Sequence, residues 1–174
     1  MTASGIPSFH PETGGGAGIR VLQRALTVAP IRRLAVDLGK YADPFLHRLT
    51  RGRLGVRMAM PFASMTTTGA KSGQPRTTAV LYFNDAADVI LIASNWGGAR
   101  HPAWYHNLKA NPAARLARGD RSGNYTATEV TDELARERLF ALAERVYPGY
   151  QDYRERTAKI GRRIPIMRLR PVDA

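Results

Sequence analysis

The chain has 174 residues, of which 44% are apolar and 23% charged, the size and composition of one ordinary globular domain. Lys and Arg outnumber Asp and Glu by 26 to 14, so the net charge is +12 and anionic partners are expected. Without Cys there are no disulfides, thiolate nucleophiles or Cys-ligated metals, and no apolar run reaches the roughly 18 residues of a membrane span. We therefore expect a cytoplasmic protein with no metal site.

The N-terminal part divides into a polar tail and a basic segment. Residues 1–17 are rich in Gly, Ser, Pro and Thr, and we expect a flexible tail. Residues 18–52 show apolar side chains at helical spacing beside arginines, and the stretch 17–60 has nine basic and two acidic residues, a net +7. Two interpretations stay open: helices packed on the core with a solvated basic face, or a basic amphipathic segment lying on the anionic inner face of the cell membrane.

Residues 53–174 are expected to form one domain. Short β-branched and aromatic stretches separated by turn residues predict strands at 56–68, 77–83, 89–93, 113–118, 124–130 and 164–169. Asn84 and Asp85 are expected to make the turn between the second and third of these strands. The pattern indicates an α+β protein built on a small barrel of about six mostly antiparallel strands with flanking helices.

Three helices are expected beside these strands. The first runs from Pro102 to Leu108. Thr131 is a suitable N-cap for the second, which should run to about residue 145. The side chains that this helix is expected to present are those of Leu134, Phe140 and Val146. The break at Pro148 and Gly149 separates it from a short third helix.

The turn at residues 66–76 is basic and rich in glycine. Gly69 and Gly73 allow the backbone to approach a ligand closely and to expose amide N–H groups that bind anions. Lys71 adds a flexible positive charge, and Arg76 adds a planar guanidinium suited to phosphate. Two interpretations stay open for this turn: a phosphate or carboxylate site, or an ordinary basic hairpin turn.

A second candidate region, residues 93–107, follows an expected buried strand and leads into a helix. It combines backbone amides, a hydroxyl, a carboxamide, a guanidinium and aromatic rings. A flat heteroaromatic ligand requires this mixture of aromatic walls and orienting polar groups. Trp104 and His106 are equally consistent with a structural role, in which they anchor the helix to the barrel. His101 and His106 do not share a helical face, so we do not expect them to bind a metal together.

A third candidate region is a tyrosine cluster at residues 147–153. Tyr150 and Tyr153 share one face of the short third helix, and Tyr147 lies just before the helix break at Pro148 and Gly149. Such a cluster closes over an apolar ligand while keeping hydroxyls available, or it forms a packing seam, and both interpretations stay open. No Gly-x-Ser-x-Gly motif or paired-carboxylate signature supports a hydrolase.

In their order and spacing these segments resemble the deazaflavin-dependent nitroreductase family of actinobacteria. The resemblance covers about residues 60–170 and rests on TTTG-x-KSGQPRT, ILIAS, HPAWYHNLKANP, YPGYQDY and IPIMRLRP. It implies a split β-barrel related to FMN-binding barrels, and an oxidoreductase with reduced coenzyme F420 as hydride donor. The implied acceptor is a small electrophile: a quinone, a nitroaromatic or an activated alkene.

The resemblance also implies roles for individual residues. The basic turn would hold the phosphate and glutamyl tail of the coenzyme, the loop after residue 93 would line the deazaflavin ring, and the tyrosines would face the acceptor. The implied coenzyme-binding residues are Thr68, Gly69, Lys71, Ser72, Gly73, Arg76, Ser94, Asn95, Trp96, Gly97, Gly98, Trp104, His106 and Asn107. The implied acceptor-binding residues are Tyr147, Tyr150 and Tyr153, and the implied catalytic residues are Ser94 and Tyr150, the latter as a candidate proton donor.

Two positions depart from the family pattern. Ala70 stands where the family often has Arg, which removes one phosphate ligand, and Asn95 stands where it often has Lys, which changes the contacts beside the ring. The alternatives are an FMN-binding oxidoreductase on the same barrel and a non-catalytic carrier of cofactor or lipid. Nucleic-acid binding is disfavoured, because no DNA- or RNA-binding module is recognisable and the aromatic residues cluster with Gly-rich loops. No oligomeric state is predicted.

Overall fold

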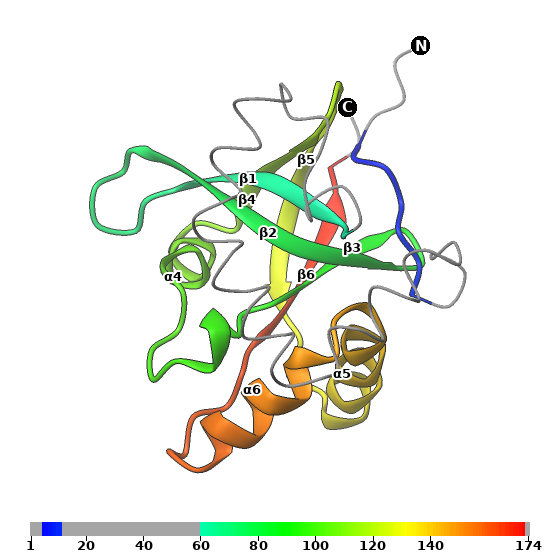
Figure 1. Ribbon diagram of the computed structural model, residues 1–174. Coiled ribbons are helices and arrows are strands. Elements are labelled where there is room, and N and C mark those ends of the chain that lie inside the picture. Colours follow the sequence, from blue (N-terminus) through cyan, green and yellow to red (C-terminus); the bar gives the residue numbers. More distant parts are fainter. Residues whose placement is uncertain (1–4, 12–59, 173–174) are drawn as a thin grey trace, which may run out of the picture.

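The computed structural model describes residues 5–11 and 60–172, in which six strands close into a barrel (Figure 1). The order around the barrel is β1-β2-β3-β6-β5-β4, and every neighbouring pair is antiparallel. The strands are β1 (Phe62–Thr68), β2 (Pro75–Asp85), β3 (Asp88–Ile92), β4 (Ala113–Arg118), β5 (Arg121–Glu129) and β6 (Ile166–Pro171). The expected α+β class and split barrel are confirmed.

Strand β3 explains how the core is divided. Successive side chains of a strand point to opposite faces. Val89 and Leu91 therefore join the cluster that fills the barrel, whereas Ile90 and Ile92 join a second cluster outside it, against the helices. Because β3 is buried on both faces, its sequence is apolar without alternation.

In the described part of the chain, four helical elements flank the barrel: η1 (Asn95–Gly97), α4 (Ala103–Ala110), α5 (Glu133–Val146) and α6 (Gly149–Ala158). In Figure 1, α5 and α6 lie together at the lower end of the view, and α4 lies on the left beside β1. Phe140 and Val146 bury the inner face of α5 in the second cluster, as expected. Within the described residues, none of these helices is long and apolar enough to cross a membrane.

Two expectations at the start of α5 are wrong. The N-cap is Asp132 rather than Thr131, because the Asp132 carboxylate accepts a hydrogen bond from the Ala135 N–H at 2.8 Å. Leu134 is 84% exposed and does not contribute to the core. Leu139 instead joins Phe140 on the buried face.

The turn between β2 and β3 also differs from the expectation. Asn84 is not a turn residue but a buried residue of β2, and the left-handed turn residue is Ala86, with a φ of 53°. The Asn84 backbone N–H donates to the Phe9 carbonyl at 2.7 Å, and its side-chain Oδ1 accepts from the Phe9 N–H at 2.8 Å. A distant segment therefore determines the conformation at Asn84.

That segment, residues 5–11, packs on the barrel. Ile6 is 5% exposed within the barrel cluster, and its N–H donates to the Tyr125 hydroxyl at 3.1 Å. The Tyr82 hydroxyl donates to the Pro7 carbonyl at 2.6 Å. The expectation of a flexible tail over residues 1–17 therefore does not hold for residues 5–11. The basic segment expected at 18–52 lies outside the described residues.

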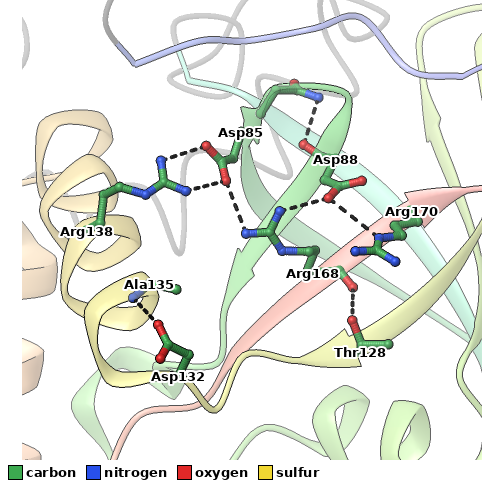
Figure 2. A network of polar contacts seen from close by, with 9 residues as sticks. Asp85, Asp88, Thr128, Asp132, Ala135, Arg138, Arg168 and Arg170 are labelled. Atoms are coloured by element: carbon green, nitrogen blue, oxygen red, sulfur yellow. Dashed lines mark hydrogen bonds and ion pairs between the residues drawn. The ribbon is translucent and has the colours of Figure 1, made fainter.

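An ion-pair network connects the β2–β3 turn to α5 and β6 (Figure 2). Asp85 accepts two hydrogen bonds from Arg138 of α5, at 2.8 and 2.7 Å, and one from Arg168 of β6 at 3.1 Å. Arg168 also donates to Asp88 at 2.8 Å. The hydrogen-bonded guanidinium of Arg138 lowers the pKa of Asp85 below its ordinary value. The network thus fixes the helix layer against the sheet.

Candidate functional site

The β1–β2 turn projects from the barrel as an exposed, positively charged loop (Figure 1). The Gly69 N–H donates to the Gln74 carbonyl at 2.9 Å, and the Gly73 N–H donates to the Gly69 carbonyl at 2.8 Å. Gly73 has a φ of 64°, in the left-handed region that favours glycine. A Cβ at Gly69 would lie 2.6 Å from the Ser72 Oγ and 3.2 Å from the Gln74 carbonyl oxygen, so a side chain there would require Ser72 to move. Lys71, Ser72 and Arg76 are exposed around this tight turn.

Asn107 of α4 holds this turn in position. Its side chain is buried, its Oδ1 accepts from the Ala70 N–H at 3.0 Å, and its Nδ2 donates to the Thr67 Oγ1 at 3.0 Å. The carboxamide therefore bridges the end of β1 and the first residue of the turn. Asn107, predicted to bind the coenzyme, is an anchor for the loop that carries Lys71.

The loop after β3 has an unusual backbone. Asn95, Trp96 and Gly97 have φ values of 49°, 58° and 71°, which are three successive residues in the left-handed region. That conformation costs about 1 kcal/mol or more for a non-glycine residue. A Cβ at Gly97 would lie 3.1 Å from the Tyr153 Cα, so only glycine lets the loop approach α6 this closely. Trp96 is left 66% exposed, and its ring meets the Tyr153 ring edge-on at 6.5 Å.

Arg162, which was not among the predicted site residues, makes four hydrogen bonds around the loop after β3. Its Nη2 donates to the Ala93 carbonyl at 2.7 Å, and its Nη1 donates to the Ser94 and Gly98 carbonyls at 2.9 and 2.8 Å. Its Nε donates to the His101 Nδ1 at 3.2 Å. Burial lowers the pKa of Arg162 below its ordinary value. Nothing in the sequence distinguishes this arginine, because its partners lie more than 60 positions earlier in the chain.

Helix α4 carries aromatic residues on two faces. Trp104 is half-buried and packs against the barrel cluster. His106 is exposed, and its ring centroid lies 6.0 Å from that of His101 and 5.4 Å from that of Tyr105. Burial, and next the Arg162 guanidinium, lower the pKa of His101, so its ring is neutral at neutral pH.

The three tyrosines form one cluster where α5 meets α6. The Tyr147 and Tyr153 hydroxyls lie 3.2 Å apart and share a hydrogen bond. Tyr150 is 5% exposed, and its ring meets those of Tyr147 and Phe140 edge-on. Burial raises the pKa of both Tyr150 and Tyr153, so both phenols keep their protons near neutral pH. The cluster is therefore also a packing seam, while the half-buried Tyr147 remains partly open to solvent.

These regions form one connected side of the molecule, seen on the left of Figure 1 from the β1–β2 turn through α4 and the loop after β3 to α6. Asn107 joins the turn to α4, Arg162 joins the loop to His101 just before α4, and Gly97 joins the loop to α6. The structure therefore brings together the regions proposed for the tail, the ring and the acceptor.

Comparison with known proteins identifies the family of the chain. The family described as F420H(2)-dependent quinone reductase matches residues 44–171. The chain belongs to this family. An F420H(2)-dependent quinone reductase from Mycobacterium tuberculosis strain H37Rv is 37% identical over 142 residues, which cover 79% of this chain and 93% of that protein.

Solved structures extend the likeness to three dimensions. An F420-H2 dependent reductase matches with a TM-score of 0.56 and 36% identity, over 63% of this chain and 93% of its own. A second protein, solved as a domain-swapped dimer, matches with a TM-score of 0.56 and 32% identity, over 75% of this chain and 97% of its own. The resemblance, the oxidoreductase class and the dependence on reduced F420 are thereby confirmed. The roles of individual residues remain predictions.

Proposed function

We propose that this F420H(2)-dependent quinone reductase family member transfers a hydride from reduced coenzyme F420 to a quinone. The observation that carries the proposal is the single connected side formed by the basic turn, the loop after β3 and the tyrosine cluster. When bound, the coenzyme supplies the hydride. A quinone that accepts one hydride and one proton becomes a hydroquinone, so the protein must also admit a proton.

The basic turn fits the anionic tail of the coenzyme. Lys71 and Arg76 are exposed on either side of the turn, where they attract negative charge without first breaking an ion pair in the described structure. Gly69 and Gly73 remove side chains that would block close approach to the backbone. Ala70 contributes only its backbone, which Asn107 holds. Charge at this turn is therefore expected to come from Lys71 and Arg76.

The loop after β3 fits the flat ring of the coenzyme. Trp96 presents an exposed aromatic surface, and the neighbouring Gly97 and Gly98 are partly exposed and add no side chain beside it. Ser94 is buried at the base of this loop, and its carbonyl is already engaged by Arg162. We therefore propose that Ser94 supports the loop that lies beside the ring, and that Trp96 stacks directly on the ring.

The tyrosine cluster fits an apolar acceptor. Its rings provide an apolar wall, and the hydrogen-bonded Tyr147 and Tyr153 hydroxyls supply polar atoms at its edge. The raised pKa of Tyr150 disfavours release of its proton but preserves it as a hydrogen-bond donor. On this basis Tyr150 orients the acceptor, and the proton that completes the hydroquinone comes from solvent.

The proposal is tested by mixing the purified protein with reduced F420 and a soluble quinone and recording coenzyme oxidation spectroscopically. Enzyme-dependent oxidation with matching formation of hydroquinone supports it. A parallel titration with FMN distinguishes this function from the alternative of an FMN-binding oxidoreductase with the same barrel fold. Tight FMN binding without F420 binding would contradict the proposal, and F420 binding without turnover would favour a carrier.

We also propose that the basic segment at residues 18–52 attaches the enzyme to an anionic membrane. The proposal rests on apolar residues at helical spacing beside arginines and on the net +7 of residues 17–60. The full chain should cosediment with anionic vesicles and remain in the supernatant with neutral ones. Replacing Arg32 and Arg33 by Glu should reduce the cosedimented fraction. Equal recovery from both vesicle types would contradict the proposal.

A further inference from the structure

Arg162 contacts both ends of the loop after β3. The carbonyls of Ala93 and Ser94 precede the three left-handed residues, and the carbonyl of Gly98 follows them. One guanidinium therefore draws the entry and the exit of the loop together. The strained backbone of Asn95 and Trp96 lies between these carbonyls. It is therefore held in place by a residue about 65 positions later in the chain.

The same side chain orients His101. Because the Arg162 Nε donates to the His101 Nδ1, the proton of the neutral ring resides on Nε2. The His101 ring also packs against the Tyr105 ring in the first turn of α4, with centroids 5.0 Å apart and planes tilted by 58°. Through His101, Arg162 thus fixes the position of the loop after β3 relative to α4, the helix whose Asn107 anchors the basic turn. The charged and titratable groups that act on His101 are Arg162, His106 and Glu129.

We infer that Arg162 is a positioning residue for the coenzyme ring: it holds the loop at residues 93–98 in its binding conformation before the coenzyme arrives. The inference rests on the proposed function, because it assigns the ring to this loop. Arginine suits the role because its planar guanidinium has five N–H donors in a fixed arrangement. A lysine ammonium is a point charge that cannot reproduce hydrogen bonds to three carbonyls and an imidazole.

The direct test compares Arg162→Lys and Arg162→Ala with the same substitutions at Arg163. Arg163 is the matched control, because it is adjacent, exposed and paired with Glu133 at the surface. Coenzyme Kd should rise about tenfold or more in both Arg162 variants, as for loss of a charged hydrogen-bond donor, and stay within about twofold in the Arg163 variants. Free guanidinium at millimolar concentration should restore binding in Arg162→Ala, whereas equal NaCl should not. Wild-type affinity in the Arg162 variants, or a loss that guanidinium does not repair, would overturn the inference.

A second test needs no coenzyme. Removing the Arg162 cation and opening the loop should raise the pKa of His101, measured by NMR titration of its ring protons in folded Arg162→Lys and Arg162→Ala. Trypsin should also cleave after Arg100 faster in these variants than in the Arg163 controls. An unchanged His101 pKa and unchanged cleavage would overturn the inference. If the wild-type protein fails to bind reduced F420, the proposed function fails, while these two measurements still decide whether Arg162 holds the loop.

Discussion

Removal of the Asn107 carboxamide should release the basic turn from α4. In the structure this side chain makes a buried hydrogen bond to the Thr67 hydroxyl and a part-buried one to the Ala70 N–H, both at 3.0 Å. Each buried hydrogen bond contributes about 0.5–1.5 kcal/mol net, so Asn107→Ala should cost about 1–3 kcal/mol of unfolding free energy. For a chain of this size that lowers Tm by about 2–12 °C.

Thermal unfolding and coenzyme titration on the same variants test this expectation. Asn107→Asp is the matched control, because its carboxylate still accepts from Ala70 while the Thr67 hydroxyl rotates to donate. Its stability should exceed that of Asn107→Ala, yet its negative charge beside Lys71 should weaken binding of the anionic tail. A double-mutant cycle that combines Asn107→Ala with Thr67→Val should give a coupling energy of about 1 kcal/mol. A loss below about 0.5 kcal/mol in Asn107→Ala would refute the anchoring role.

Three further outcomes are expected. Lys71→Ala and Arg76→Ala should each weaken coenzyme binding by about 1–3 kcal/mol and flatten its salt dependence in calorimetric titrations, whereas Arg170→Ala, on β6, should not. Tyr150→Phe should lower turnover with little change in coenzyme Kd, and unchanged turnover would make Tyr150 a packing residue only. Asp85→Asn should cost about 1 kcal/mol at neutral pH. Because Arg138 lowers the Asp85 pKa, this carboxylate stabilises the fold above about pH 4, and the stabilisation disappears as pH falls through the lowered pKa. The unfolding free energy of Asp85→Asn should therefore approach that of the wild type as the pH is lowered, which unfolding curves measured at a series of acidic pH values would show.

Features determined by neighbouring residues were predictable from the sequence. The break between the strands expected at 113–118 and 124–130 falls at Gly119, whose φ of 62° in the structure suits glycine, and the separation of α5 from α6 follows from Pro148. The ordered motifs also indicated the family, because each preserves local backbone and side-chain chemistry. These signals are short-range, so no knowledge of the packing is needed to interpret them.

Features determined by packing were not predictable. Leu134 fits the helical spacing of an inward residue, yet it lies at the solvent-exposed start of α5. Asn84 has the composition of a turn residue, but Phe9 pairs with it from 75 positions away. The hydrogen bonds by which the Asn107 carboxamide joins Ala70 and Thr67 were likewise not predictable, because they cross 37 and 40 positions of the chain.

The sequence by itself determined the kinds of group available: a basic glycine turn, a Gly-rich aromatic loop and a tyrosine cluster. Only the tertiary structure decided that they share one side of a closed barrel, and that Arg162 joins the ends of the loop between them. The physical reason is that a hydrogen bond depends on separation in space, whereas sequence patterns report only separation along the chain. An arginine 64 positions after the carbonyl it binds leaves no periodic signal.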